Sequence, residues 1–137
     1  MTITYRPCIP DDIDAVLALW VEGGQKGSTD NAGAIARRLK RDPQLFILAW
    51  NGATLAGSVI GAWDGWRANM YRLVVSAEYR RQGIASQLVQ MVEEELRKLG
   101  VTRVYALALI NSTQAGLFWH RHGYRPNSRI EPLAKTL

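Results

Sequence analysis

Apolar residues recur with helical spacing in four stretches of the chain. The first stretch places four of them on one side of a helix: Ile13, Val16, Leu17 and Trp20. Pro10 and two aspartates precede this stretch and Gly23 follows it, and such residues are typical of a helix start and a helix end. The same spacing predicts further helices over residues 32–41, from Ile84 to about Leu99, and from Ser112 to about His122.

Alternating or continuous apolar runs predict strands between these helices. Residues 2–6 form the first strand, and the runs 45–50 and 55–62 flank Asn51-Gly52, a strong signal for a β-hairpin. Asp64-Gly65 leads into a third run over 69–75. The run 104–109 is apolar on both faces, as is typical of a buried central strand, and residues 124–129 form a last strand. The order predicts an α+β fold, with a mixed, mostly antiparallel central sheet and helices on both faces.

Length and composition favour an ordinary folded protein. The 137 residues suit one domain spanning 1–137, and the 47% hydrophobic and 21% charged residues are close to average globular usage. The single cysteine, Cys8, cannot form an internal disulfide, which fits a reducing compartment. The N-terminus lacks a basic segment followed by an apolar run, and no stretch approaches the ~20 apolar residues of a membrane span. We therefore expect a cytoplasmic protein without a membrane partner.

The net charge of +5 would suit a nucleic-acid binder, but its distribution argues otherwise. The dense basic cluster lies on one predicted helix, without aromatic residues for base stacking: Arg37, Arg38, Lys40 and Arg41. A solvated helix face and a site for an acidic small molecule both remain open for this cluster. We predict no nucleic-acid partner.

The candidate chemistry centres on the turn from Arg80 to Ala85, between a strand and a helix. The first amides of a helix lack partners within it and lie at the positive end of its dipole. Gly83 would allow close approach of a ligand, and Arg80 and Arg81 could add charged hydrogen bonds to phosphate oxygens. The turn therefore predicts an anion site, with a plain turn carrying surface arginines as the alternative.

Two motifs resemble those of the GNAT superfamily of N-acetyltransferases. The first, Leu73-x-Val75-x-x-x-x-Arg80-x-x-Gly83-Ile84-Ala85, is similar to the pyrophosphate-binding motif of that family. The second, Asn111-x-x-x-Ala115-x-x-Phe118-Trp119-x-x-x-Gly123-Tyr124, is similar to its closing helix and strand. The order of elements agrees from about Ile3 to Arg129. The stretch 61–67 also looks like small stand-alone bacterial members of the YpeA type.

The resemblance implies transfer of an acetyl group from acetyl-CoA to a primary amine, by direct attack in a ternary complex and without a metal. It implies a bulge in the strand over 69–75, which would splay from the strand over 104–109 and leave a gap for the pantetheine arm. The acceptor would be a small-molecule amine or a protein amine, and a homodimer is common in the family. The residues implied to bind acetyl-CoA are Leu73, Val74, Val75, Arg80, Arg81, Gln82, Gly83, Ile84, Ala85, Ser86, Asn111 and Phe118. For Asn111, capping of the following helix is the alternative.

Trp119 departs from the family pattern, which often has a tyrosine there to protonate the departing thiolate. An indole N–H can donate a hydrogen bond but cannot give up a proton at ordinary pH. Three interpretations follow. The thiolate, whose conjugate thiol has a pKa of about 8.5, leaves unaided and takes a proton from water; Tyr124, Tyr105 or His120 supplies the proton; or the protein is an acyl-CoA-binding regulatory module with weak or no turnover.

Asp64 is the candidate general base. Its neighbours Trp63 and Trp66 could desolvate the carboxylate and raise its pKa, although Asp64-Gly65 is equally a standard turn pair. Four aromatic residues are candidates to line the acceptor pocket, with core packing as the alternative: Trp20, Trp63, Trp66 and Tyr71. His120 and His122 diverge on a helix and cannot chelate one ion, so we expect no metal.

Overall fold

The computed structural model describes residues 1–108 and 113–137, and within it the chain divides into two compact units, 1–107 and 108–137. Among the described residues, the first unit holds five strands and three α-helices, and the second holds one α-helix. The four predicted helices are confirmed as α1 (Ile13–Glu22), α2 (Ala32–Arg41), α3 (Ile84–Lys98) and α4 (Thr113–Arg121). The predicted start of the last helix, at Ser112, lies outside the described residues. None of the described helices is both long and apolar enough to cross a bilayer.

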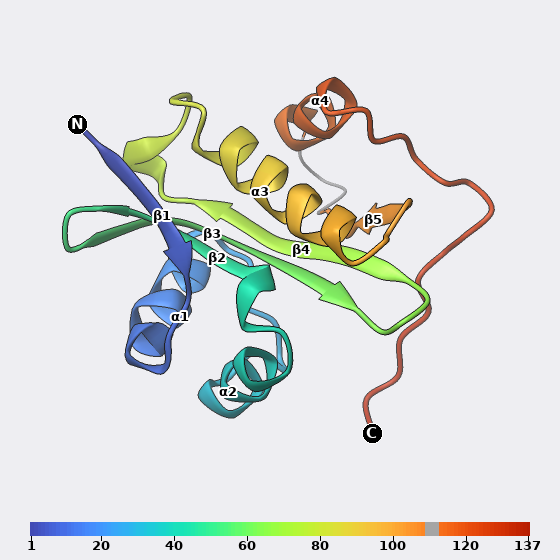
Figure 1. The fold of residues 1–137 in the computed structure, drawn as a ribbon, viewed down its shortest axis with the longest axis horizontal. Coiled ribbons are helices and arrows are strands. Elements are labelled where there is room, and N and C mark those ends of the chain that lie inside the picture. Colours follow the sequence, from blue (N-terminus) through green and yellow to red (C-terminus); the bar gives the residue numbers. More distant parts are fainter. Residues whose placement is uncertain (109–112) are drawn as a thin grey trace. The chain divides into compact units, whose positions relative to one another are not determined.

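The first unit is built on a five-stranded sheet whose strands lie in chain order (Figure 1). The strands are β1 (Ile3–Pro7), β2 (Phe46–Asn51), β3 (Thr54–Trp63), β4 (Ala68–Val75) and β5 (Val104–Ala106). The first four pair antiparallel, and β5 pairs parallel with β4. Helix α3 covers one face, and α1 and α2 cover the other. The predicted mixed, mostly antiparallel sheet with helices on both faces is confirmed.

Two strand predictions are wrong. Strand β5 has three half-buried residues and ends the strand order, whereas a central strand over 104–109 was expected; residue 109 lies outside the described residues. Residues 124–129 form no strand. Pro126 has no N–H for a ladder, and the N–H groups of Arg129 and Ile130 donate to the Asn127 side chain and carbonyl, which folds this segment into a turn.

Two glycines on β3 allow α3 to pack closely on the sheet. A Cβ on Gly61 would lie 2.7 Å from Cγ1 of Val92, and one on Gly57 would lie 3.1 Å from the Val74 carbonyl oxygen. Val92 is fully buried, as is Leu88, which lies beside Gly57. Because side chains alternate along a strand, Ser58 and Ile60 point to the opposite face, toward α1 and α2. The glycines therefore set how near α3 comes to the strands.

Replacing Gly61 with alanine is expected to lower the free energy of unfolding by about 1–3 kcal/mol, because the new methyl group would force Val92 out of its place. Urea denaturation measures this loss. Gly33→Ala is the matched control, because its Cβ would meet only the Arg37 and Asn31 side chains, at 3.4 Å. Gly33 lies in α2, where alanine is the better helix former, so this variant should be neutral or more stable. Equal losses in the two variants would contradict the packing argument.

A buried carboxylate holds the start of α1. Asp12 is 6% exposed, and its two oxygens accept hydrogen bonds from Arg6 Nη1 at 2.7 Å and Nη2 at 3.0 Å. The Ile9 N–H also donates to Asp12 Oδ2, at 2.9 Å. The hydrogen bonds from Arg6, and then that from Ile9, hold the pKa of Asp12 below its ordinary value despite burial.

Replacing Asp12 with asparagine should therefore destabilise the protein in a pH-dependent way. A lowered folded-state pKa stabilises the protein above the ordinary aspartate pKa of about 3.9, and this contribution is lost as pH falls through the folded-state pKa. The difference in unfolding free energy between wild type and Asp12→Asn should be largest near neutral pH and shrink below about pH 4. Denaturant unfolding across this range measures it, with the exposed Asp11→Asn as control. A difference that does not change with pH would contradict the assignment.

Candidate active site

Strand β4 carries a bulge opposite β3. Tyr71 pairs with Ile60 and Val74 pairs with Ser58, so two β4 residues, Arg72 and Leu73, lie opposite Val59 alone. Arg72 has a φ of 56°, in the left-handed region that residues with side chains rarely adopt. The expected bulge in this strand is confirmed. Its conformation has to be held by its surroundings, because left-handed backbone is strained in such a residue.

A buried chain of hydrogen bonds holds the bulge. Trp20 Nε1 on α1 donates to the Ser58 hydroxyl at 3.0 Å, and this hydroxyl donates to the Arg72 carbonyl oxygen at 2.9 Å. Ser58 is fully buried and Trp20 is 2% exposed. Since buried polar groups are costly to leave unpaired, the chain favours the one backbone conformation that satisfies all three groups. Helix α1 thus fixes the bulge through β3.

Beyond the bulge, one edge of β4 is open. Strand β5 pairs only with Ala68–Met70, and among the described residues no strand pairs with 73–75 on that edge. The Ser76 N–H donates to the Ala56 carbonyl. Hydrogen-bonded and non-hydrogen-bonded residue pairs alternate along an antiparallel ladder. Because Ser76 is hydrogen-bonded to Ala56, Val74 is hydrogen-bonded to Ser58 through its main chain. The main-chain groups of Leu73 and Val75 then face the open edge.

Side chains already use this open edge as a hydrogen-bonding surface. Gln25 Nε2 donates to the Leu73 carbonyl oxygen, and Arg80 Nε donates to that of Val75, each at 3.2 Å. Both contacts agree with the direction that the ladder gives to these carbonyls. Of the predicted residues 73–75, Leu73 and Val75 therefore have main-chain groups on the open edge, whereas those of Val74 pair with β3. The cofactor-binding role of all three stays a prediction.

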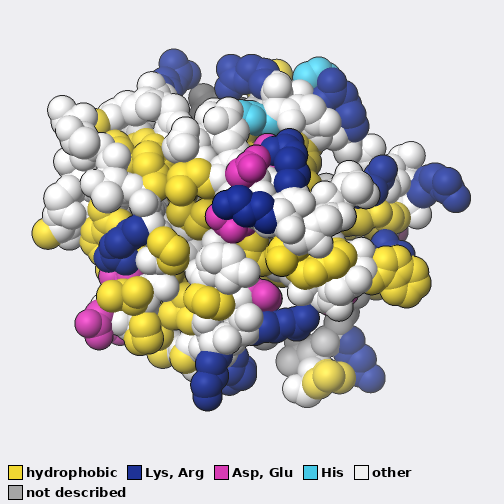
Figure 2. Space-filling model, in the orientation of Figure 1, with side chains coloured by type: hydrophobic (Ala, Val, Ile, Leu, Met, Phe, Trp, Pro, Cys, Tyr) yellow, Lys and Arg dark blue, Asp and Glu magenta, His cyan; other side chains and the backbone are white. Residues whose placement is uncertain are grey.

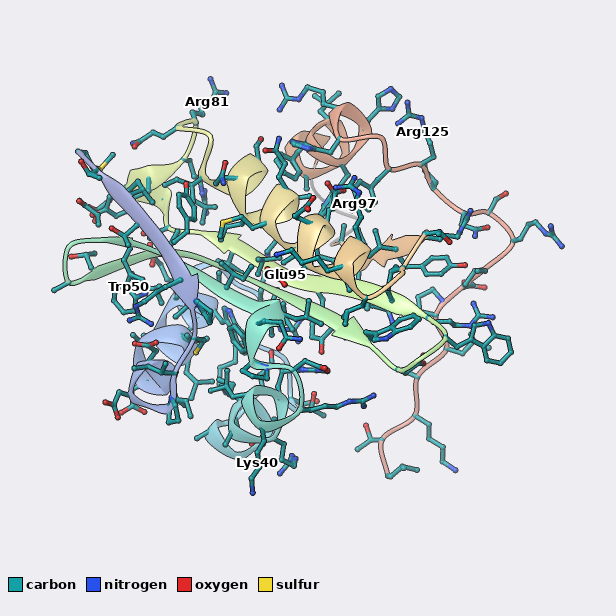
Figure 3. All side chains as sticks on the ribbon, in the orientation of Figure 1. Lys40, Trp50, Arg81, Glu95, Arg97 and Arg125 are labelled. Atoms are coloured by element: carbon teal, nitrogen blue, oxygen red, sulfur yellow. The ribbon has the colours of Figure 1, made fainter. Side chains whose placement is uncertain are left out.

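The turn before α3 provides no side-chain cap for the first amides of that helix. It follows a short 3-10 helix, η3 (Ala77–Tyr79), and includes two left-handed residues, Arg81 with a φ of 62° and Gly83 with a φ of 81°. Gly83 is the N-cap and supplies no side-chain cap, and the helical hydrogen bonds begin with Gln87 N–H to Gly83 O at 3.1 Å. The N–H groups of Ile84 and Ala85 precede that bond. Arg81 projects outward from the tip of this turn (Figure 3).

Asp64 does not have the surroundings expected of a general base. Its Oδ1 accepts hydrogen bonds from the N–H groups of Arg67 at 2.6 Å and Trp66 at 2.8 Å, which lower the pKa of Asp64. The expected rise in pKa is wrong, because Trp66 is 83% exposed and does not cover the carboxylate. Asp64 forms the β3–β4 turn, and the five steps along β4 from Ala68 to Leu73 separate it from the bulge by about 16 Å.

In the second unit, aromatic rings form a cluster at the end of α4. The Phe118 ring lies 5.2 Å from that of Trp119 and 4.5 Å from that of His122. Tyr124 packs against Trp119 at 4.9 Å and donates its N–H to the Trp119 carbonyl. The site roles predicted for Phe118, Trp119 and Tyr124 stay predictions, and Asn111 lies outside the described residues. Among the described residues, no group of His, Cys, Asp or Glu side chains is arranged to hold a metal ion.

A cavity of about 440 Å³ opens on the α1 and α2 face of the first unit and reaches the bulge at Arg72. Its apolar lining is Trp20, Ile35, Phe46, Ile60 and Tyr71, and its charged lining is Asp30, Arg37, Arg38, Arg41 and Arg72. Trp20 and Tyr71 line it as predicted, whereas Trp63 and Trp66 do not. Three arginines of the predicted basic cluster thus border the cavity. Lys40 projects from α2 away from the sheet (Figure 3), and Figure 2 shows Lys and Arg side chains at the surface in the region of α2.

Sequence reasoning did not single out Ser58, Asp30 or Arg72. Ser58 carried a usable signal, because a hydroxyl within the apolar run 55–62 needs a partner once the strand is buried. Asp30 and Arg72 carried none, since their contact joins residues 42 positions apart.

The comparisons with known proteins agree with this fold. Residues 14–124 match the acetyltransferase (GNAT) family. An acetyltransferase of Sodalis glossinidius is 34% identical over 128 residues, which cover 93% of this chain and 90% of the relative. One from Pectobacterium atrosepticum is 34% identical over 98 residues, which cover 71% of this chain and 70% of the relative. The crystal structure of PaiA N-acetyltransferase from Thermoplasma acidophilum in complex with coenzyme A aligns with a TM-score of 0.82 and 17% identity, over 91% of each chain.

The fold and the matches identify an enzyme that transfers acetyl groups. The chain belongs to the acetyltransferase (GNAT) family, and the resemblance of its two motifs to that family is confirmed.

Proposed function

We propose that this protein transfers the acetyl group of acetyl-CoA to a primary amine, by direct attack of the amine on the thioester in a ternary complex. The observation that carries the proposal is the open edge of β4 at Leu73 and Val75, which leads along the chain to the uncapped N-terminus of α3. An edge that pairs like a strand and a helix N-terminus without a side-chain cap suit an extended amide-containing arm that ends in phosphates.

The fit to acetyl-CoA rests on donors and acceptors present in the first unit. The amides of Gln82 to Ser86 and the guanidinium groups of Arg80 and Arg81 would hold the pyrophosphate. The main-chain groups of Leu73 and Val75 would pair with the pantetheine amides. A carbonyl oxygen has two lone pairs, so the Gln25 and Arg80 contacts need not exclude such pairing. A main-chain N–H at the bulge would stabilise the oxyanion as the amine attacks.

The proton steps are assigned to water. The attacking nitrogen forms the new C–N bond and loses a proton, and the C–S bond breaks to release coenzyme A as a thiolate. Asp64 lies at the hairpin, and Asp30 is paired with Arg72 at 2.8 Å, so neither carboxylate is placed to accept the amine proton. A thiol with a pKa of about 8.5 is a good enough leaving group to depart and then take its proton from solvent.

Release of free thiol from acetyl-CoA in the presence of a panel of primary amines tests the proposal. We expect release above the uncatalysed rate for at least one amine, with N-acetylation of that amine confirmed by mass. Because Trp119 replaces the usual tyrosine, the second candidate is an acyl-CoA-binding module without turnover. A rise in melting temperature with acetyl-CoA, combined with no thiol release for any amine, would favour that candidate and contradict ours.

A further inference from the structure

We propose that the acceptor is a small amine that also carries a carboxylate, and that the cavity between α1, α2 and the sheet binds this carboxylate through the arginines of α2. The inference rests on the proposed function in one respect, namely that the second substrate is an amine. It adds the chemical class of that amine, which the family does not determine.

The charge of the cavity lining is the first argument. Four arginines and one aspartate line it, and the aspartate is already paired. Asp30 Oδ2 accepts from Arg72 Nε at 2.9 Å and lies 2.8 Å from its Nη2. Asp42 pairs with Arg38 and Arg41, so the four arginines still exceed the two carboxylates and the potential of the lining is positive. Such a cavity favours an anionic group and disfavours a polycation such as a polyamine.

One α2 arginine of the cavity lining has no acidic partner among the described residues. Arg38 and Arg41 both pair with Asp42. Arg37 is exposed and makes no ion pair within residues 1–108 and 113–137. A carboxylate is the acceptor that guanidinium geometry suits best. Arg37 therefore offers its donors to such a ligand.

The opposite side of the cavity is apolar and aromatic. Trp20 stacks on Phe46 with ring centroids 6.1 Å apart, and Ile60 and Tyr71 extend this surface. The Arg72 guanidinium lies 5.7 Å from the Trp20 ring and marks the end of the cavity at the bulge. Trp20, Phe46 and Ile60 are buried, and Tyr71 is half-buried. An acceptor with its carboxylate at α2 and an apolar body against Tyr71 would direct its amine toward the bulge. A volume of about 440 Å³ suits a molecule of this size.

A matched pair of amines tests the assignment. With acetyl-CoA present, 4-(aminomethyl)benzoate should show a kcat/KM at least about tenfold higher than 4-(aminomethyl)benzamide, the scale of one charge-assisted contact. The two share the amine and the ring, and differ in charge. Equal rates, a preference for the benzamide, or spermidine as the best acceptor would overturn the inference. A preference for 2-aminoethyl phosphate over 3-aminopropanoate would overturn the choice of carboxylate.

Two variants of α2 give the matched control. Arg37→Gln should reduce the preference for benzoate over benzamide several-fold, whereas Lys40→Gln, with the same change of charge on the same helix, should keep it because Lys40 projects away from the sheet. Equal effects of the two variants would mean that only net charge matters, which contradicts a site in the cavity.

Binding without turnover separates this inference from the proposed function. In the presence of coenzyme A, calorimetry should detect 4-methylbenzoate binding more tightly than 4-methylbenzamide, and Arg37→Gln should weaken the former. If this holds while no amine releases thiol, the cavity assignment stands and the proposed activity fails. If neutral amines are acetylated and the benzoate does not bind, the activity stands and the inference fails.

Discussion

Replacing Gly83 with valine is expected to weaken the binding of coenzyme A at least about tenfold. Gly83 has a φ of 81°, which is strained for a β-branched residue, and relief of about 1–3 kcal/mol of strain would remodel the turn. Remodelling displaces the N–H groups of Ile84 and Ala85 from the point where phosphates would bind. The cause is conformational, since nothing lies within 4 Å of a Cβ built at this position.

Gly52→Val provides the control for that experiment. Gly52 has a φ of 59° and an equally open Cβ position, but it lies in the β2–β3 turn. This variant should be destabilised to a similar extent and should bind coenzyme A as the wild type does. Calorimetric titration measures the Kd of each protein at a temperature where both are folded. Unchanged affinity in Gly83→Val, or an equal loss in both variants, would contradict the pyrophosphate assignment.

Replacing Ser58 with alanine should cost roughly 2–4 kcal/mol of unfolding free energy. The substitution leaves two buried groups, Trp20 Nε1 and the Arg72 carbonyl, without the hydroxyl that joins them, at about 1–3 kcal/mol for each. It also frees the strained backbone of Arg72, so acetyl transfer should fall as well. Urea denaturation and thiol release measure the two effects.

A double variant shows whether the loss comes from the hydrogen-bond chain. Trp20→Phe removes the indole donor, so Ser58→Ala should cost less in the Trp20→Phe background than in the wild type. The exposed Ser28→Ala should change stability by less than about 0.5 kcal/mol. Additive losses of unfolding free energy for Trp20→Phe and Ser58→Ala would show that the hydrogen-bond chain does not hold the bulge. A urea midpoint for Ser58→Ala equal to that of the wild type would show the same.

The extra residue in β4 lies where the proposed cofactor edge and the proposed acceptor cavity meet. The bulge at Arg72 and Leu73 precedes the segment where β4 loses its strand partner, so the Leu73 and Val75 main chains face an open edge. The same bulge places Arg72 at the lining of the cavity, where Asp30 holds it. The proposed cofactor edge and the proposed acceptor cavity therefore meet at a single strained position.

Local signals in the sequence predict most of the fold. The helix over 32–41 has the predicted bounds, because Asn31 caps it and its apolar residues Ile35 and Leu39 face inward. The hairpin at Asn51-Gly52 is present because that dipeptide suits the left-handed turn that Gly52 adopts. The two remaining strand predictions had weaker grounds, because 104–109 depended on apolar content alone and 124–129 on its place after the helix end at Gly123. The first was predicted too long, and the second does not form.

The candidate site was less predictable, because its parts join residues that are far apart in sequence. The turn at 80–85 could be read directly, since a helix N-terminus and glycine need no distant partner. By contrast, the hydrogen bond between Trp20 and Ser58 spans 38 positions, and no local pattern indicates it. The prediction for Asp64 is wrong for the opposite reason, because it depended on sequence neighbours alone. The rings of Trp63 and Trp66 predict a raised pKa, whereas hydrogen bonds from the main-chain N–H groups of Arg67 and Trp66 lower the pKa of Asp64.

The central claim is that coenzyme A binds along the open edge of β4 and at the start of α3. Amide proton–nitrogen correlation spectra of isotopically labelled protein, recorded with and without coenzyme A, test it most directly. The largest changes are expected at Leu73, at Val75 and at Gln82 to Ala85, with the amides of α2 nearly unchanged. Saturable changes at these positions would locate the cofactor along the open edge of β4 and at the start of α3. Unchanged amides at 82–85, with the main changes in α2 or in the hairpin around Asp64, would contradict it.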